Sequence, residues 1–149
     1  MMDDLYWMKI ALTESYKAFE QDEIPVGAVL TKNNQLIMQN HNCTQAMNSP
    51  LAHAEMLILL DIQTREKYLY DYTLYVTLEP CLMCAGAMIL SKLGRLVYGA
   101  SDPKTGVVGS VYNVMGDKHF NHHPEVFSGI LEAECGSILK KFFQAKRGH

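Results

Sequence analysis

The sequence lacks the features that mark membrane, secreted or disordered proteins. It has 48% hydrophobic and 19% charged residues, which argues against a disordered, collagen-like or coiled-coil chain. No run approaches the roughly 18 consecutive apolar residues that a membrane span requires. The start, Met1-Met2-Asp3-Asp4, has neither the basic segment nor the apolar core of a secretory signal. We therefore expect a cytoplasmic protein without membrane association, folded as a single domain over residues 1–149.

An excess of positive charge, which is typical of nucleic-acid-binding proteins, is also missing. The formal net charge is −3, and this value alone lowers the expectation of a nucleic-acid partner. The distribution is uneven, because acidic residues crowd the first segment whereas no acid follows Glu134. The tail carries Lys140, Lys141, Lys146 and Arg147. One end of the chain could therefore face an anion.

The sequence has four cysteines, and in a reducing compartment these are poor candidates for disulfides. Cys81 and Cys84 are separated by two residues, a spacing typical of a metal-binding or redox pair. On a helix that begins at this point, both side chains project from the first turn, where the helix dipole favours the thiolate form. The two thiolates can then bind one metal ion. Cys43 and Cys135 look unrelated to it.

What is present is an alternation of apolar segments with strand and helix periodicity. The turn-forming Lys32-Asn33-Asn34 between two short apolar runs predicts an antiparallel hairpin, and the apolar segment 56–60 predicts a buried helix. The expected helices cover 4–21, 52–63, 81–90 and 131–146, and the expected strands cover 26–30, 36–38, 73–77 and 95–99. Strands that alternate with helices imply parallel crossovers with helices on both faces. We therefore predict an α/β fold, a three-layer α/β/α domain with a mixed central sheet.

His53 and Glu55 add the chemistry that a cysteine pair lacks. His53 offers an imidazole ligand and Glu55 a carboxylate, and both lie at the start of a predicted helix. Residues two apart on a helix diverge, so Glu55 suits proton transfer better than it suits metal ligation. We therefore predict that His53, Cys81 and Cys84 bind one zinc ion and that Glu55 is the catalytic proton shuttle.

The number of ligands separates a catalytic zinc from a structural one. Structural sites are closed by four protein ligands, whereas catalytic sites keep one position for water. The sequence supplies three clear ligands, which favours a catalytic zinc. In the competing interpretation, a closed structural site, the fourth ligand would be Cys43, Cys135 or His41, although Cys135 already fits the apolar stripe of the last helix.

The motifs resemble those of a known family. His53-Ala54-Glu55 followed by Pro80-Cys81-Leu82-Met83-Cys84 matches the H-x-E…P-C-x-x-C signature of the zinc nucleobase deaminases. The chain is similar nearly end to end to the bacterial tRNA-specific adenosine deaminases, a family within the cytidine and deoxycytidylate deaminase superfamily. The similarity beyond the zinc motif runs through the segments 6–8, 24–29, 74–81, 99–102 and 104–106, together with Phe142-Phe143 in the tail.

This resemblance implies a cytidine-deaminase-like domain and a definite reaction. The reaction is the hydrolytic deamination of adenosine to inosine at the wobble position (34) of a tRNA anticodon, by zinc-activated water with Glu55 as proton shuttle. The implied cofactor is one Zn²⁺ per subunit. The implied partners are the tRNA anticodon stem-loop and a second copy of the chain in a homodimer. A wobble base must be splayed out to reach a buried metal, which costs less in a loop than in a duplex.

Four further residues match substrate-contacting positions of the family or suit RNA contact. Asn42 matches the position that holds the nucleobase, and Asp102 matches a substrate-loop position where a carboxylate could accept from a ribose 2′-hydroxyl. Lys104 is a candidate for phosphate contact, and Phe143 for stacking on a flanking base. The competing interpretations are a turn residue for Asn42, a solvated cation for Lys104 and core packing for Phe143. His122 and His123, in a later loop, remain without an assigned role.

Two other functions stay open on the sequence alone. A deaminase of a free base or nucleotide, such as guanine or cytosine, would share the zinc site, Glu55 and the fold. A zinc-stabilised interaction domain without catalysis would need Cys81 for folding and would not need Glu55. The basic tail and the Asp102 loop favour the RNA substrate.

Overall fold

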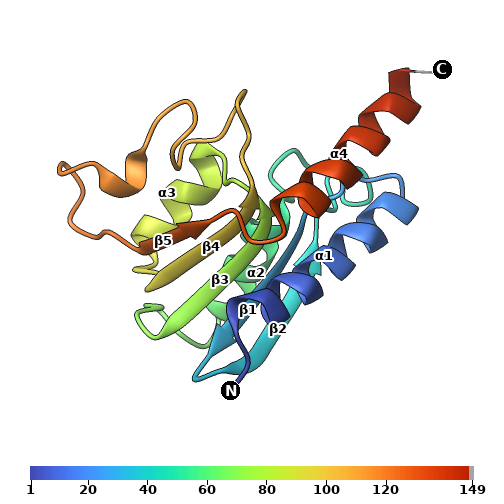
Figure 1. Ribbon diagram of the computed structural model, residues 1–149. Helices are drawn as coiled ribbons and strands as arrows, with labels where there is room; N and C mark the ends of the chain where they lie inside the picture. Colours follow the sequence, from blue (N-terminus) through green and yellow to red (C-terminus); the bar gives the residue numbers. More distant parts are fainter. Residues whose placement is uncertain (148–149) are drawn as a thin grey trace.

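The computed structural model describes residues 1–147, and its elements follow the predicted alternation (Figure 1). The elements are α1 (Asp4–Glu20), β1 (Gly27–Lys32), β2 (Gln35–His41), α2 (Ala54–Ile62), β3 (Tyr72–Leu78), α3 (Leu82–Leu90), β4 (Arg95–Ala100), the 3₁₀ turn η1 (Val114–Gly116), β5 (Glu125–Ser128) and α4 (Glu132–Arg147). All four predicted helices and all four predicted strands are present, with ends that differ by a few residues.

The five strands form one mixed sheet in the order β2-β1-β3-β4-β5. β1 pairs antiparallel with β2 and with β3, whereas β3, β4 and β5 run parallel. The β1–β2 hairpin turns at Asn33 and Asn34, whose φ angles of 51° and 57° suit the left-handed conformation of a type I′ turn. The predicted hairpin and mixed sheet are confirmed.

Helices cover both faces of the sheet, which confirms the three-layer prediction (Figure 1). Side chains alternate along β1, so that Ala28 and Leu30 pack in the core under α2 and α3 while Val29 packs in the core under α1. The start of α4, through Cys135, joins the α1 side. No helix within residues 1–147 has the length and apolar character to cross a membrane.

Two features differ from the sequence prediction. The apolar segment of α2 is not buried all round, because Leu60 is 62% exposed, and on the neighbouring helix α3 Leu90 is 79% exposed. The strand β5 was not expected. Its four residues are all exposed, and it becomes a strand by pairing with β4, a contact between segments that are distant in the sequence.

Candidate functional site

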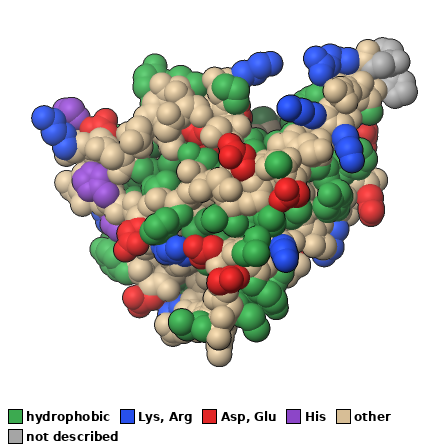
Figure 2. Space-filling view, viewed as in Figure 1, with side chains coloured by type: hydrophobic (Ala, Val, Ile, Leu, Met, Phe, Trp, Pro, Cys, Tyr) green, Lys and Arg blue, Asp and Glu red, His purple; other side chains and the backbone are tan. Residues whose placement is uncertain are grey.

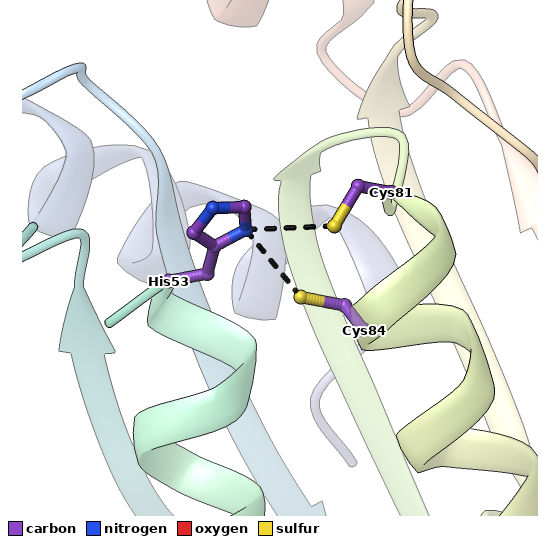
Figure 3. Close-up of side chains that lie close together, drawn as sticks. All are labelled: His53, Cys81 and Cys84. Carbon is purple, nitrogen blue, oxygen red and sulfur yellow. Dashed lines mark hydrogen bonds between the residues drawn. The ribbon is translucent and has the colours of Figure 1, made fainter. Parts of the chain in front are cut away.

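Two helices begin side by side on the same face of the sheet. His53 is the N-cap residue of α2 and Cys81 is the N-cap residue of α3, and neither side chain caps its own helix. They point instead toward each other. Nδ1 of His53 lies 3.6 Å from Sγ of Cys81 and 3.6 Å from Sγ of Cys84, which comes from the first turn of α3 (Figure 3). The two helix starts therefore converge on one point, as the motif spacing predicts.

The donor set fits a zinc ion. One ligand atom from each of His53, Cys81 and Cys84 lies within 4.8 Å of the other two. A tetrahedral zinc, with Zn–S of about 2.3 Å and Zn–N of about 2.1 Å, separates its sulfur and nitrogen ligands by about 3.6 Å. The observed spacing matches this value, and one imidazole with two thiolates is a borderline-soft set of the kind that zinc prefers.

The three residues considered as a fourth ligand lie elsewhere. Among residues 1–147, the metal-ligating group consists of His53, Cys81 and Cys84 and of no other side chain. His41 contacts Glu14 through Nδ1, and the Cys43 thiol donates to the backbone carbonyl of His41. Cys135 is buried in the core under α1. The described part of the chain thus offers a three-ligand site, which is the pattern of a catalytic zinc.

The three side chains of the cluster shift one another's pKa values through their close contacts. The hydrogen bond from Cys84 lowers the pKa of Cys81 to about 4, and His53 adds to this effect. The same contact with Cys81, together with burial, raises the pKa of the Cys84 thiol. The hydrogen bond to Cys81 raises the pKa of His53. When a metal ion binds such a cluster, the cysteine thiols lose their protons and their sulfur atoms become ligands.

Glu55 lies beside the cluster without joining it. It sits in the first turn of α2 with only 4% of its surface exposed. Burial raises the pKa of its carboxyl group, with partial compensation by a backbone hydrogen bond and by His53. A carboxyl group with a raised pKa, next to a metal-binding cluster, is suited to take up and return protons.

A cavity of about 530 Å³ opens above the cluster. It is lined by most of the site residues that the sequence singles out, namely Asn42, His53, Glu55, Cys81, Asp102, Lys104 and Phe143. Cys84 is fully buried and does not line the cavity. The structure therefore brings together, at one cavity, residues that are up to 101 positions apart in the sequence.

Three of the segments that line the cavity carry the predicted substrate-contact residues. Asn42 is 5% exposed, and its side-chain amide donates to the backbone carbonyl of Ile24 and to Thr44 Oγ1, each at 3.4 Å. Asp102 shapes its own loop, because it accepts from the backbone N–H of Lys104 at 3.0 Å and from Thr105 Oγ1 at 2.7 Å. Lys104 itself is exposed at the rim.

The third of these lining segments is α4. Phe143 is 44% exposed and lines the cavity, whereas the adjacent Phe142 is buried against Phe19. Core packing, the competing interpretation of Phe143, is therefore wrong. His122 and His123 donate to the backbone carbonyls of Leu93 and Asp117 and do not line the cavity.

Sequence reasoning missed two buried carboxylates at the base of the cavity loops. Glu23 is 1% exposed and accepts from the backbone N–H groups of Gln45 and Ala46. Glu79 is 2% exposed and, unlike Glu23, lines the cavity. The available signal was the position of Glu79, a single acid between an apolar strand and the Pro80 that precedes the metal motif.

This fold and this site together define a deaminase of the cytidine-deaminase-like class. The sequence model of the MafB19-like deaminase family matches residues 2–147. A tRNA-specific adenosine deaminase of Bacillus subtilis (strain 168) is 45% identical over 149 residues, covering 99% of this chain and 92% of the relative. The chain therefore belongs to the tRNA-specific adenosine deaminases, within the cytidine-deaminase-like family.

Solved structures agree with this placement. A structure from a study of A-to-I editing by tRNA:A34 deaminases at the wobble position of transfer RNA superposes with a TM-score of 0.84 at 40% identity, covering 89% of this chain and 97% of that one. A guanine deaminase from Nitrosomonas europaea superposes with a TM-score of 0.76 at 21% identity, covering 95% of this chain and 85% of that one. The second similarity shows the shared fold alone.

Proposed function

We propose that this protein catalyses the hydrolytic deamination of adenosine to inosine at position 34 of a tRNA anticodon. The observation that carries the proposal is the arrangement at one cavity of the His53, Cys81 and Cys84 cluster with Glu55 beside it. Support for the RNA substrate comes from the relatives, which are named for tRNA adenosine deamination, at 45% and 40% identity.

The metal of this site is proposed to be zinc, one ion per subunit. His53, Cys81 and Cys84 would hold it, because their donor atoms have the spacing and softness that zinc requires. Bound there, zinc would supply a Lewis acid that makes water nucleophilic near neutral pH. Two thiolates neutralise much of the ion's charge, so a neighbouring base is needed to complete the activation of water.

Glu55 is proposed to be that base. It takes a proton from the attacking water and then returns protons to the purine ring and to the departing ammonia. Its burial next to the cavity keeps bulk water from competing for these protons. The carbon that bears the amino group loses ammonia and gains oxygen, so adenosine becomes inosine.

The cavity suits one splayed base with its neighbours in the loop. Its volume of about 530 Å³ lies within the range of small-molecule sites, and its mouth is open to the surface. Asn42 can offer its side-chain oxygen as an acceptor to a purine edge, because its amide N–H groups already bond Ile24 and Thr44. Asp102 and Lys104 at the rim are placed for the ribose and phosphate, and Phe143 presents its ring to a flanking base.

Basic side chains at one edge of the cavity offset the overall negative charge. Figure 2 shows Lys and Arg side chains gathered over the C-terminal part of α4. Lys140 lines the cavity, whereas Lys146 pairs with Asp22 at 2.5 Å. The local charge near Lys140 and Lys104 therefore favours phosphate contact despite the net charge of −3 of the whole chain.

A homodimer is proposed from the exposed apolar face that α2 and α3 share. Leu60 and Leu90 are 62% and 79% exposed and line one shallow depression together with Met56 and Ala87. An uncovered leucine pair on adjacent helices is typical of a subunit interface. A second copy of the chain would cover this face, whose residues are distinct from those that line the cavity.

The test of the proposed function is substrate choice. The zinc-loaded protein is incubated separately with a tRNA anticodon stem-loop that carries adenosine at position 34, with free adenosine, with guanine and with cytosine. Inosine formed in the stem-loop supports the proposal, and a stem-loop with guanosine at position 34 is the matched control. Turnover of free guanine or cytosine alone would support the alternative enzyme, and turnover of none would favour a non-catalytic zinc domain.

A further inference from the structure

Glu79 is a buried carboxylate with an unusual number of loop donors. It follows β3, is 2% exposed, and accepts four hydrogen bonds from the segment 102–110. Oε1 accepts from the backbone N–H of Asp102 at 3.0 Å and from the hydroxyl of Ser110. Oε2 accepts from the backbone N–H groups of Val108 at 2.9 Å and Ser110 at 3.0 Å. Both carboxylate oxygens are therefore committed to one loop.

The loop is fitted closely around this carboxylate. A Cβ atom at Gly106 would lie 2.3 Å from Cδ of Glu79 and 2.6 Å from the backbone oxygen of Asp102, so only glycine permits this approach. Val107 adds a backbone bond to the carbonyl of Pro80 at 3.1 Å. The segment that carries the cavity-lining Asp102 and Lys104 is thus built on Glu79 at both of its ends.

We infer that Glu79 is a positioning residue that holds the 102–110 loop, and with it Asp102 and Lys104, at the rim of the cavity. This inference rests on the proposed function, since the loop is taken to contact the RNA. Glu79 does not contact the reacting base in this assignment and acts through the loop. A carboxylate is required because every one of its four partners is a donor, whereas a glutamine has one acceptor oxygen and would turn an N–H group toward backbone N–H groups.

The test is the variant Glu79→Gln in the full-length, zinc-loaded protein. The loop contacts stabilise the bound RNA equally in the ground state and in the transition state. Their loss therefore raises KM for the anticodon stem-loop by about tenfold while kcat changes by less than about threefold. Zinc content, measured by mass spectrometry, stays at the wild-type value because the metal ligands are untouched. Hydrogen exchange at the amides of Asp102, Val108 and Ser110 becomes faster, independently of any activity.

Val29→Ala is the matched control for general destabilisation. Val29 packs on the α1 side of the sheet, so this variant lowers Tm and leaves both KM and the exchange of the loop amides unchanged. If Glu79→Gln does not fold, Ser110→Ala tests the same contact, because it removes one of the four donors. It is expected to raise KM by about threefold and to speed exchange at Val108.

Two outcomes would overturn the inference. One is an unchanged KM with unchanged exchange of the loop amides. Another is a loss of zinc that accounts for the loss of activity, which would mean that Glu79 acts through Cys81 instead. If the wild-type protein does not convert the stem-loop at all, the proposed function fails, and the exchange measurement still decides whether Glu79 holds the loop.

Discussion

Asp4 and Arg95 form a two-point ion pair between the first turn of α1 and the first residue of β4. Oδ1 of Asp4 lies 2.7 Å from Nη1 of Arg95, and Oδ2 lies 2.6 Å from Nη2. The hydroxyl of Tyr75 also donates to Oδ1 at 2.7 Å. The hydrogen bonds from Arg95 lower the pKa of the Asp4 carboxyl below its ordinary value of 3.8, although partial burial opposes this effect. The pair ties α1 to β4, and the Tyr75 contact ties it to the central strand β3.

Replacing Asp4 with asparagine is expected to destabilise the protein by an amount that depends on pH. A carboxyl whose pKa is lower in the folded state stabilises the fold fully above its unfolded pKa of 3.8, and this contribution is lost as the pH falls through the folded pKa. Asp4→Asn should therefore lower the free energy of unfolding by about 1–2 kcal/mol at pH 7 and by much less near pH 2.5. Urea unfolding at both pH values checks this, with Asp61→Asn as an exposed control. A loss that is equal at both pH values would contradict the assignment.

Glu55→Gln is expected to abolish catalysis without removing the metal. The amide cannot accept the proton of the attacking water, so kcat for the stem-loop should fall by about 10³-fold. The ligand atoms of His53, Cys81 and Cys84 do not change, so zinc content and Tm should stay close to wild type. Glu20→Gln, at the exposed end of α1, is the matched control. Activity within tenfold of wild type would remove Glu55 from the mechanism.

Removal of the metal is expected to cost both activity and stability. With free zinc at about 100 times its dissociation constant, binding to the folded state contributes about 2.7 kcal/mol. Chelation should therefore lower Tm and eliminate turnover, and added zinc should restore both. Cys84→Ser should reproduce the loss permanently, whereas Cys43→Ser, outside the ligand group, should bind zinc as the wild type does. The readouts are metal analysis and thermal unfolding.

A charge placed on the α2–α3 face is expected to separate the proposed dimer. Leu90→Asp buries an unpaired carboxylate in each half of a symmetric interface, so the dissociation constant should rise by about 100-fold or more. Light scattering during gel filtration measures the mass of the species. Tyr16→Glu adds a charge on α1, across the sheet, and should leave the mass unchanged. A wild-type protein that runs as a monomer would contradict the proposal itself.

The predictable parts of the fold were those with a local signal. Asn33 and Asn34 tolerate positive φ, and so the hairpin could be read from the sequence. The strand β5 could not, because Val126 and Phe127 are both exposed and the strand exists through its pairing with β4. The exposure of Leu60 could not be predicted either. A helix that is apolar all round has the same sequence pattern whether its whole surface is buried within one chain or part of it is exposed.

The candidate site likewise has parts that could be predicted from the sequence and parts that could not. The cluster of His53, Cys81 and Cys84 could be predicted because motif spacing places ligands at helix starts. The bonds of Glu79 could not, since its partners Asp102 and Ser110 lie 23 and 31 positions further along the chain. No spacing rule connects residues that meet only after a loop has folded back on the sheet.

Two adjacent phenylalanines provide the sharpest test of RNA contact. Phe142 is 7% exposed and packs edge-on against Phe19 with ring centroids 6.1 Å apart, whereas Phe143 is 44% exposed at the cavity. The same substitution at each position therefore separates packing from stacking.

Phe143→Leu keeps an apolar side chain but removes the flat aromatic face on which a base can stack. Because stacking contributes about 1–3 kcal/mol per base, KM for the anticodon stem-loop should rise by at least about fivefold, with Tm nearly unchanged. Phe142→Leu should show the reverse, a loss of stability of up to about 1.5 kcal/mol with KM unchanged. Steady-state kinetics and thermal unfolding on both variants decide the matter. Equal effects of the two substitutions on KM would mean that α4 acts as a structural support and that Phe143 does not contact the RNA.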